Sequence, residues 1–166
     1  MSGDAGTGTG TFTAENSSLS IQTDSKYYKT APMFFITNTD AVINLTNCNL
    51  EYGSNVLISA KGTSEWGNSG SNGGNVTLNA NSQILEGNIE IDNISTLEMN
   101  LSNNSSYTGA INSDNTAKQI TLKIDSTSKI KLTGDTYITS LEDDDKNYSN
   151  IDFNGYKLYV NGTAIN

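Results

Sequence analysis

Two side chains on which many enzymes and nucleic-acid-binding proteins depend are missing from this chain of 166 residues: it has no His and no Arg. Without His there is no Ser-His-Asp or Cys-His nucleophile system and no ordinary zinc site. The nine Lys residues are outnumbered by 18 Asp and Glu residues, so the net charge is −9. Such a charge repels phosphate backbones and anionic membrane surfaces. We therefore expect neither a nucleic-acid partner nor a membrane partner.

Apolar residues and cysteine are also scarce. Hydrophobic residues make up 34% of the chain, and none of their runs approaches the ~20 residues of a membrane-spanning helix. The single cysteine, Cys48, cannot form an internal disulfide, and we expect it to pack as a small residue at a corner of the fold.

Residue types that favour turns and short strands are abundant. The chain contains 23 Asn and 15 Gly beside many Ser and Thr, and no segment shows a 3.6-residue apolar period. Short alternating apolar runs recur instead, at 42–45, 76–78, 97–101 and 120–124. Each run is bounded by Asn, Ser, Gly or Asp, which is typical of β-strands.

The spacing of these runs predicts the fold class. The last residues of the four runs are separated by 33, 23 and 23 residues; they are Leu45, Leu78, Leu101 and Ile124. Each run is followed by a glycine, and these glycines are separated by 34, 22 and 25 residues; they are Gly53, Gly87, Gly109 and Gly134. A period near 23 indicates one coil of a solenoid. We predict an all-β chain that forms a right-handed parallel β-helix of about five to six coils. An antiparallel β-sandwich is the alternative, but it gives no reason for the constant run-to-glycine offset.

Two segments interrupt the repeat and predict loops inserted at corners. One covers 59–74, which is rich in Gly and Ser, and the other covers 22–32. We expect a Gly-rich N-terminal segment over 1–10 and a single β-helix domain over 11–166.

The acidic residues do not suggest catalysis. They are scattered, except for the run Glu142-Asp143-Asp144-Asp145, for which a solvated turn is the favoured interpretation. Hydrolases on this type of fold need close carboxylate pairs, and lyases use a cationic base, commonly Arg. We expect that the chain is not an enzyme.

Two Asp-Asn pairs are candidate metal ligands. Asp92 and Asn93 follow Gly87 at the same distance as Asp114 and Asn115 follow Gly109, so the pairs are predicted on adjacent coils, roughly 4.8 Å apart. Two carboxylates that close repel unless they are solvated or bridged, and a calcium ion would relieve the repulsion. The alternative is a turn in which the carboxylates point to water.

Aromatic residues in the two predicted loops are candidate sugar platforms, because sugar faces stack on exposed rings. They are Trp66 in one loop and Tyr27 and Tyr28 in the other. For Trp66 the alternative is that the ring folds down and anchors its loop.

Five segments, 32–43, 66–78, 111–115, 132–141 and 154–162, resemble the bacterial extracellular carbohydrate-binding β-helix family first described as a cellulose- and pectin-binding protein. The Trp-Gly and Thr-Gly-Asp segments are the more specific ones, and the resemblance spans roughly 11–164. It implies a secreted or surface-attached protein that binds plant-type polysaccharide without catalysis and holds calcium, with Asp114 inside a matching motif. Members usually begin with a signal peptide and further coils, so this chain looks like the C-terminal part of a longer helix or a shortened relative.

These features together predict an extracellular or cell-surface protein that binds a polysaccharide such as cellulose or pectin. The alternative, of a different class, is a structural or adhesin-type solenoid that self-associates end to end into a fibre, because a β-helix exposes pairable edges at both ends.

Overall fold

The computed structural model describes residues 8–166, and in this part of the chain every regular element is a β-strand. The eighteen strands are β1 (Thr9–Glu15), β2 (Ser18–Ser20), β3 (Phe34–Ile36), β4 (Thr39–Thr46), β5 (Asn49–Glu51), β6 (Val56–Ala60), β7 (Gly74–Asn81), β8 (Ile84–Glu86), β9 (Asn88–Ile91), β10 (Thr96–Ser102), β11 (Ser106–Gly109), β12 (Gln119–Ile124), β13 (Lys129–Leu132), β14 (Thr136–Ile138), β15 (Ser140–Asp143), β16 (Ile151–Asp152), β17 (Leu158–Val160) and β18 (Thr163–Ala164). No helix in residues 8–166 is long and apolar enough to cross a membrane.

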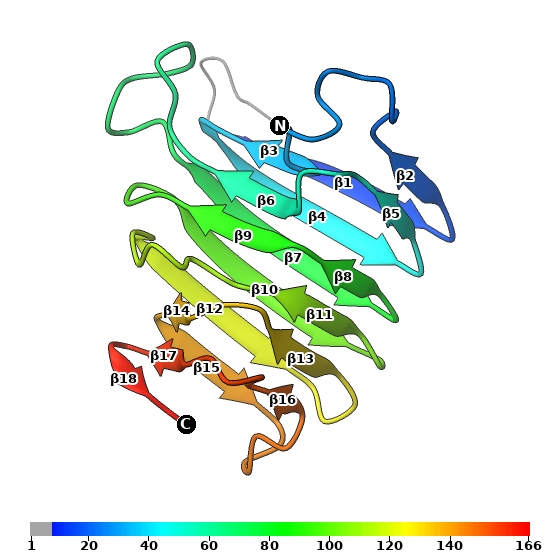
Figure 1. Ribbon diagram of the computed structural model, residues 1–166. Coiled ribbons are helices and arrows are strands. Elements are labelled where there is room, and N and C mark those ends of the chain that lie inside the picture. The colour runs from blue at the N-terminus through cyan, green and yellow to red at the C-terminus, as the bar shows by residue number, and fades with distance from the viewer. Residues whose placement is uncertain (1–7) are drawn as a thin grey trace.

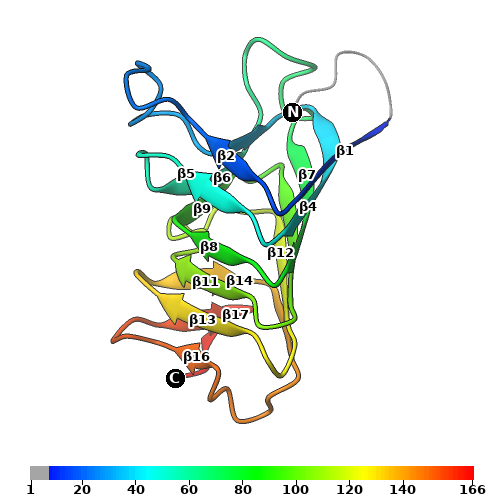
Figure 2. The ribbon, with the colours of Figure 1, turned by 90° about the vertical axis from the view of Figure 1, so that its right-hand side faces the viewer.

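One six-stranded sheet, which we call the long sheet, organises the molecule. Its order is β1-β4-β7-β10-β12-β15, and all its pairs are parallel. We call the segment from one of these strands to the next a repeat. The shorter strands of each repeat form four smaller sheets, β2-β5, β3-β6-β9, β8-β11-β13-β16 and β14-β17-β18. Figure 2 shows the long sheet along one side and the shorter strands on the other.

Parallel pairing dominates throughout the described residues. In the described part of the chain, only β17 and β18 pair antiparallel. Parallel strands require a crossover between them, which each repeat supplies through its shorter strands and corners. The prediction of an all-β, mostly parallel chain is therefore confirmed, and an antiparallel sandwich does not fit.

The register differs in detail from the predicted one. Leu101 and Ile124 pair as expected, but Leu78 pairs with Ile43 and Met99 and lies two residues away from the expected partner positions. A shift of two leaves every side chain on the same face, because side chains alternate with a period of two, so the apolar pattern alone cannot detect it. Among the glycines, Gly109 lies against Gly87 but pairs with Leu132 and not with Gly134.

Inward columns of side chains form a narrow core between the layers. In β7 and β10 every second residue is buried. One column runs Ala14–Leu45–Ala80–Leu101–Ile124 through five repeats. Since each repeat buries only a few side chains, a chain with 34% hydrophobic residues can still fill its core.

The corners after the first four strands of the long sheet each begin with a residue in the left-handed backbone region. Asn16, Asn47, Ser82 and Asn103 directly follow β1, β4, β7 and β10, with φ of 47°, 48°, 48° and 55°. Asn enters this region more readily than most residues, which explains part of the high Asn content. Cys48 is buried at the corner between β4 and β5, as expected.

The two predicted loops connect β2 to β3 and β6 to β7. Ser59 and Ala60 belong to β6 and Gly74 to β7, so the second loop is shorter than predicted, while β1 already begins at Thr9. Both loops lie at the end of the molecule formed by the first repeats (Figures 1 and 2).

Candidate functional site: a groove between two strand edges

The stack of short strands is interrupted between β5 and β8. These strands occupy corresponding places in neighbouring repeats (Figure 1). Among residues 8–166, however, β5 pairs only with β2, and β8 pairs only with β11. The facing edges of β5 and β8 are therefore not joined by strand pairing.

A buried glutamine bridges one end of this interruption. The Gln83 side chain is 0% exposed, and its Oε1 accepts a hydrogen bond from the Cys48 N–H at 2.7 Å. Its Nε2 donates to the Cys48 carbonyl at 2.8 Å and to the Ile84 carbonyl at 2.8 Å. The amide thus satisfies the backbone groups of Cys48 that a neighbouring strand would otherwise pair.

The same corner in later repeats uses serine. The Gln83 N–H donates to Ser105 Oγ at 3.0 Å, and the Ser105 N–H donates to Ser128 Oγ at 3.2 Å. The shorter serine lets successive repeats approach closely enough for β8, β11 and β13 to pair. The longer glutamine side chain holds β5 and β8 apart, which opens a groove.

Tyr52 bridges the other end. Its hydroxyl donates a hydrogen bond to the Glu86 carbonyl and lies so close to Gly87 that a Cβ there would clash with it. Burial, together with the negative charge of Glu86, raises the pKa of Tyr52 to about 12. The phenol therefore stays protonated and able to donate at neutral and moderately alkaline pH.

The groove has a volume of about 560 Å³ and combines amides with an exposed apolar side chain. Its polar lining includes the side chains of Asn47, Asn49, Asn55 and Ser82. Ile84, on the groove wall, is 68% exposed. Among the described residues that line the groove, Glu86 is the only one with a carboxylate. Amides paired with an apolar surface match a sugar ring, which presents hydroxyls at its rim and C–H groups on its faces.

The three aromatic residues predicted to bind sugar are divided between two places. Tyr28 borders the groove, because its ring packs against Gly53 so closely that a Cβ there would clash, and its carbonyl accepts the Gly53 N–H at 3.0 Å. Tyr27 is 55% exposed, with the Lys26 ammonium 4.8 Å from its ring centroid. Trp66 is 43% exposed in the other loop, and Figures 1 and 2 show the two loops apart. Whether any of them binds sugar stays a prediction.

The aspartates of the two predicted Asp-Asn pairs, Asp92 and Asp114, line a second groove of about 360 Å³. The bridge between Ile89 and Ile111 sets the register that brings them into neighbouring repeats. Asp92 Oδ2 accepts from the Gly62 N–H at 2.9 Å and Oδ1 from the Ile94 N–H at 3.2 Å, so this carboxylate caps backbone groups of two loops.

Asp114, Asn93 and Asn115 are exposed and are the remaining oxygen donors of the predicted calcium site. Within residues 8–166 no three His, Cys, Asp or Glu side chains converge as metal ligands. A calcium ion held by these four residues therefore stays a prediction.

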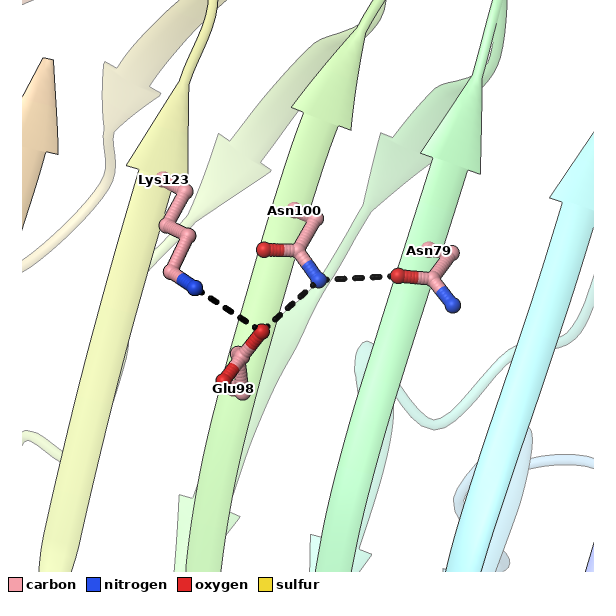
Figure 3. Close-up of polar contacts among 4 residues, drawn as sticks. All are labelled: Asn79, Glu98, Asn100 and Lys123. Atoms are coloured by element: carbon pink, nitrogen blue, oxygen red, sulfur yellow. Dashed lines mark hydrogen bonds and ion pairs between the residues drawn. The ribbon is translucent and has the colours of Figure 1, made fainter.

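The outward face of the long sheet carries a ladder of amides. Asn44 donates to Thr13 Oγ1 at 3.1 Å, Asn79 donates to Asn44 Oδ1 at 2.8 Å, and Asn100 donates to Asn79 Oδ1 at 2.8 Å. The ladder ends at an ion pair, because Asn100 also donates to Glu98 Oε1, which lies 3.1 Å from Lys123 Nζ (Figure 3). These bonds link strands of successive repeats on the solvent side.

The amine and the amide in Figure 3 both contact the carboxylate of Glu98. The hydrogen bond with Glu98 raises the pKa of Lys123, and the hydrogen bond from Lys123 lowers the pKa of Glu98. Both groups are therefore charged at neutral pH. These three residues form a polar contact on the outward surface of the long sheet.

The sequence pattern did not predict the groove residues, because the predicted register between β4 and β7 is two residues away from the observed one. An exact register would have aligned Gln83 with Ser105 and Ser128 and marked it as the one long side chain in a column of short ones. Nothing in the sequence around Tyr52 indicated a role in a groove, apart from its position next to Gly53.

Replacing Gln83 tests its bridging role. Gln83→Leu keeps the side chain's bulk but leaves the buried Cys48 N–H and carbonyl without partners, which we expect to cost about 1–3 kcal/mol in free energy of unfolding. Chemical denaturation measures the change, and Gln22→Leu in an exposed loop position is the control, expected to have little effect. Equal stability of the two variants would contradict the bridge.

Comparisons with family models, with curated proteins and with solved structures gave no match. The resemblance to a carbohydrate-binding β-helix family thus rests on the sequence segments alone and stays a hypothesis.

Proposed function

We propose that the chain is a right-handed parallel β-helix of about five to six coils that binds polysaccharide without catalysis, outside the cell or at its surface. The order of the long sheet supports this architecture, since six strands from successive repeats pair in parallel and in sequence order. Each repeat between them adds further strands that pair with those of the next repeat. Such connectivity is that of a solenoid whose repeats contact only their neighbours.

The groove between β5 and β8 is the observation on which the binding proposal rests. It is open, about 560 Å³ in volume, and lined by amides and a hydroxyl around the exposed Ile84. Asn amides both donate and accept hydrogen bonds, as sugar hydroxyls do. An apolar side chain on the groove wall offers a surface to the C–H face of a sugar ring.

The charge of the protein favours an uncharged polymer in this groove. With a net charge of −9 and Glu86 in the lining, the protein repels a polyuronate such as pectin. Cellulose carries no charge and meets no such barrier. Pectin binding would need a bridging cation, which is the role we propose for calcium at Asp92, Asn93, Asp114 and Asn115.

A pull-down on cellulose and on polygalacturonate, each with calcium or with chelator, tests the function. We expect binding to cellulose under both conditions and binding to polygalacturonate only in calcium. Ile84→Asp places a second charge in the groove and should weaken cellulose binding at least tenfold, equal to about 1.4 kcal/mol. Tyr156→Asp changes another exposed side chain, far along the chain, and should bind like the unaltered protein.

Trp66→Ala in the same assay separates the groove from the loop. Loss of binding in this variant with full binding by Ile84→Asp would move the sugar site to the loop between β6 and β7. Failure of the unaltered protein to bind either polymer in calcium would contradict the proposed function altogether.

A structural role is the second candidate, and the edges of the long sheet favour it. Among residues 8–166, β1 pairs only with β4 and β15 only with β12, so each presents an edge that another copy could pair with. In that case light scattering should show mass rising with concentration and electron microscopy should show filaments. A mass of one chain at all concentrations would contradict it.

A further inference from the structure

A carboxylate occupies an inward position at the last strand of the long sheet. Asp143 ends β15 and pairs in register with Ile124. The preceding members of this inward column are all apolar: Ala14, Leu45, Ala80, Leu101 and Ile124. Asp143 is 3% exposed, so for this residue the expected solvated turn over 142–145 is wrong.

The hydrogen bonds of Asp143 satisfy only one of its two oxygens. Oδ1 accepts from the Asp145 N–H at 2.9 Å and from Asn150 Nδ2 at 3.0 Å. Oδ2 is buried and has no hydrogen-bond donor among the described residues, and the same holds for Asn150 Oδ1. Because Asn150 donates to Asp143, the two side chains are in contact. Two side chains in contact thus each carry a buried acceptor oxygen that lacks a hydrogen-bond donor.

The donors of the surrounding loop are engaged elsewhere. Lys146 Nζ donates to the backbone carbonyl of Asp143. The Asn147 and Ser149 N–H groups both donate to the carboxylate of Asp145, at 2.9 Å each. The loop therefore folds around the two oxygens without supplying a hydrogen bond to them.

We propose that Asp143 Oδ2 and Asn150 Oδ1 are ligands of a calcium ion enclosed by the loop between β15 and β16. Carboxylate and amide oxygens are ligands that Ca²⁺ prefers, and backbone carbonyls and water commonly complete its shell. The ion would balance a carboxylate held inside an otherwise apolar column, where an unpaired charge is costly. This site is separate from the one proposed at Asp92 and Asp114 and does not depend on polysaccharide binding.

Thermal unfolding of the full chain, freed of metal by chelator and then titrated with CaCl₂, tests the site. At a free Ca²⁺ concentration about a hundredfold above Kd, we expect Tm to rise by about 5–10 °C. Asp114→Asn should keep most of this rise, because it leaves the loop unchanged. In the Asp114→Asn background, Asp143→Asn should abolish the rise that remains, and Asn150→Ala should weaken calcium affinity at least tenfold. Asp144→Asn is the matched control, since Asp144 is exposed beside Asp143, and should behave like the unaltered chain.

Several outcomes would overturn the site. An unchanged Tm of the native sequence in calcium would mean that water fills the place between the two oxygens. A rise that survives in Asp143→Asn but is lost in Asp114→Asn would assign all calcium binding to the other groove. If Asp143→Asn does not fold, calorimetric titration of Asp114→Asn with CaCl₂ decides. Binding of one calcium ion per chain, with an affinity that Asn150→Ala lowers, supports the site. Absence of calcium binding in Asp114→Asn overturns it.

Discussion

Parallel pairing between the long strands of successive repeats is the interaction on which the rest of this structure depends. It fixes which side chains stack in each inward column, and it satisfies the backbone of a chain that has few apolar residues to bury. The same pairing aligns the outward amides, so that Asn44, Asn79 and Asn100 bond to one another without extra cost in backbone order. The same strand register therefore determines both which side chains stack in the core and which amides bond on the surface.

Two of the candidate sites lie where a column of equivalent side chains changes its chemistry. In the corner column, Gln83 stands where later repeats have serine, and the facing edges of β5 and β8 separate into a groove. In the inward column, Asp143 stands where earlier repeats have apolar residues, and two oxygens are left without donors. A sheet built from successive repeats makes such exceptions conspicuous, because a position in one strand has a register partner in the next.

Much of the fold could be predicted from the sequence. The runs at 42–45, 76–78, 97–101 and 120–124 lie within β4, β7, β10 and β12, because alternation of apolar residues reports a half-buried strand directly. The register could not be fixed, since a shift of two residues leaves the alternation intact, as Leu78 illustrates. The sites were missed for a related reason: Gln83 and Asp143 look like ordinary polar residues until their columns are known.

Oxidation of paired cysteines measures the register most directly. With Cys48 replaced by Ala, cysteines at Thr77 and Glu98 are register partners on the outward face, with Cα atoms about 4.8 Å apart, within disulfide range. Cysteines at Thr77 and Thr96 are offset by two residues, at a diagonal distance of about 7–8 Å. The in-register stack predicts rapid disulfide formation in the first pair and slow formation in the second. Faster closure of the offset pair would contradict the register and, with it, both columns on which the candidate sites rest.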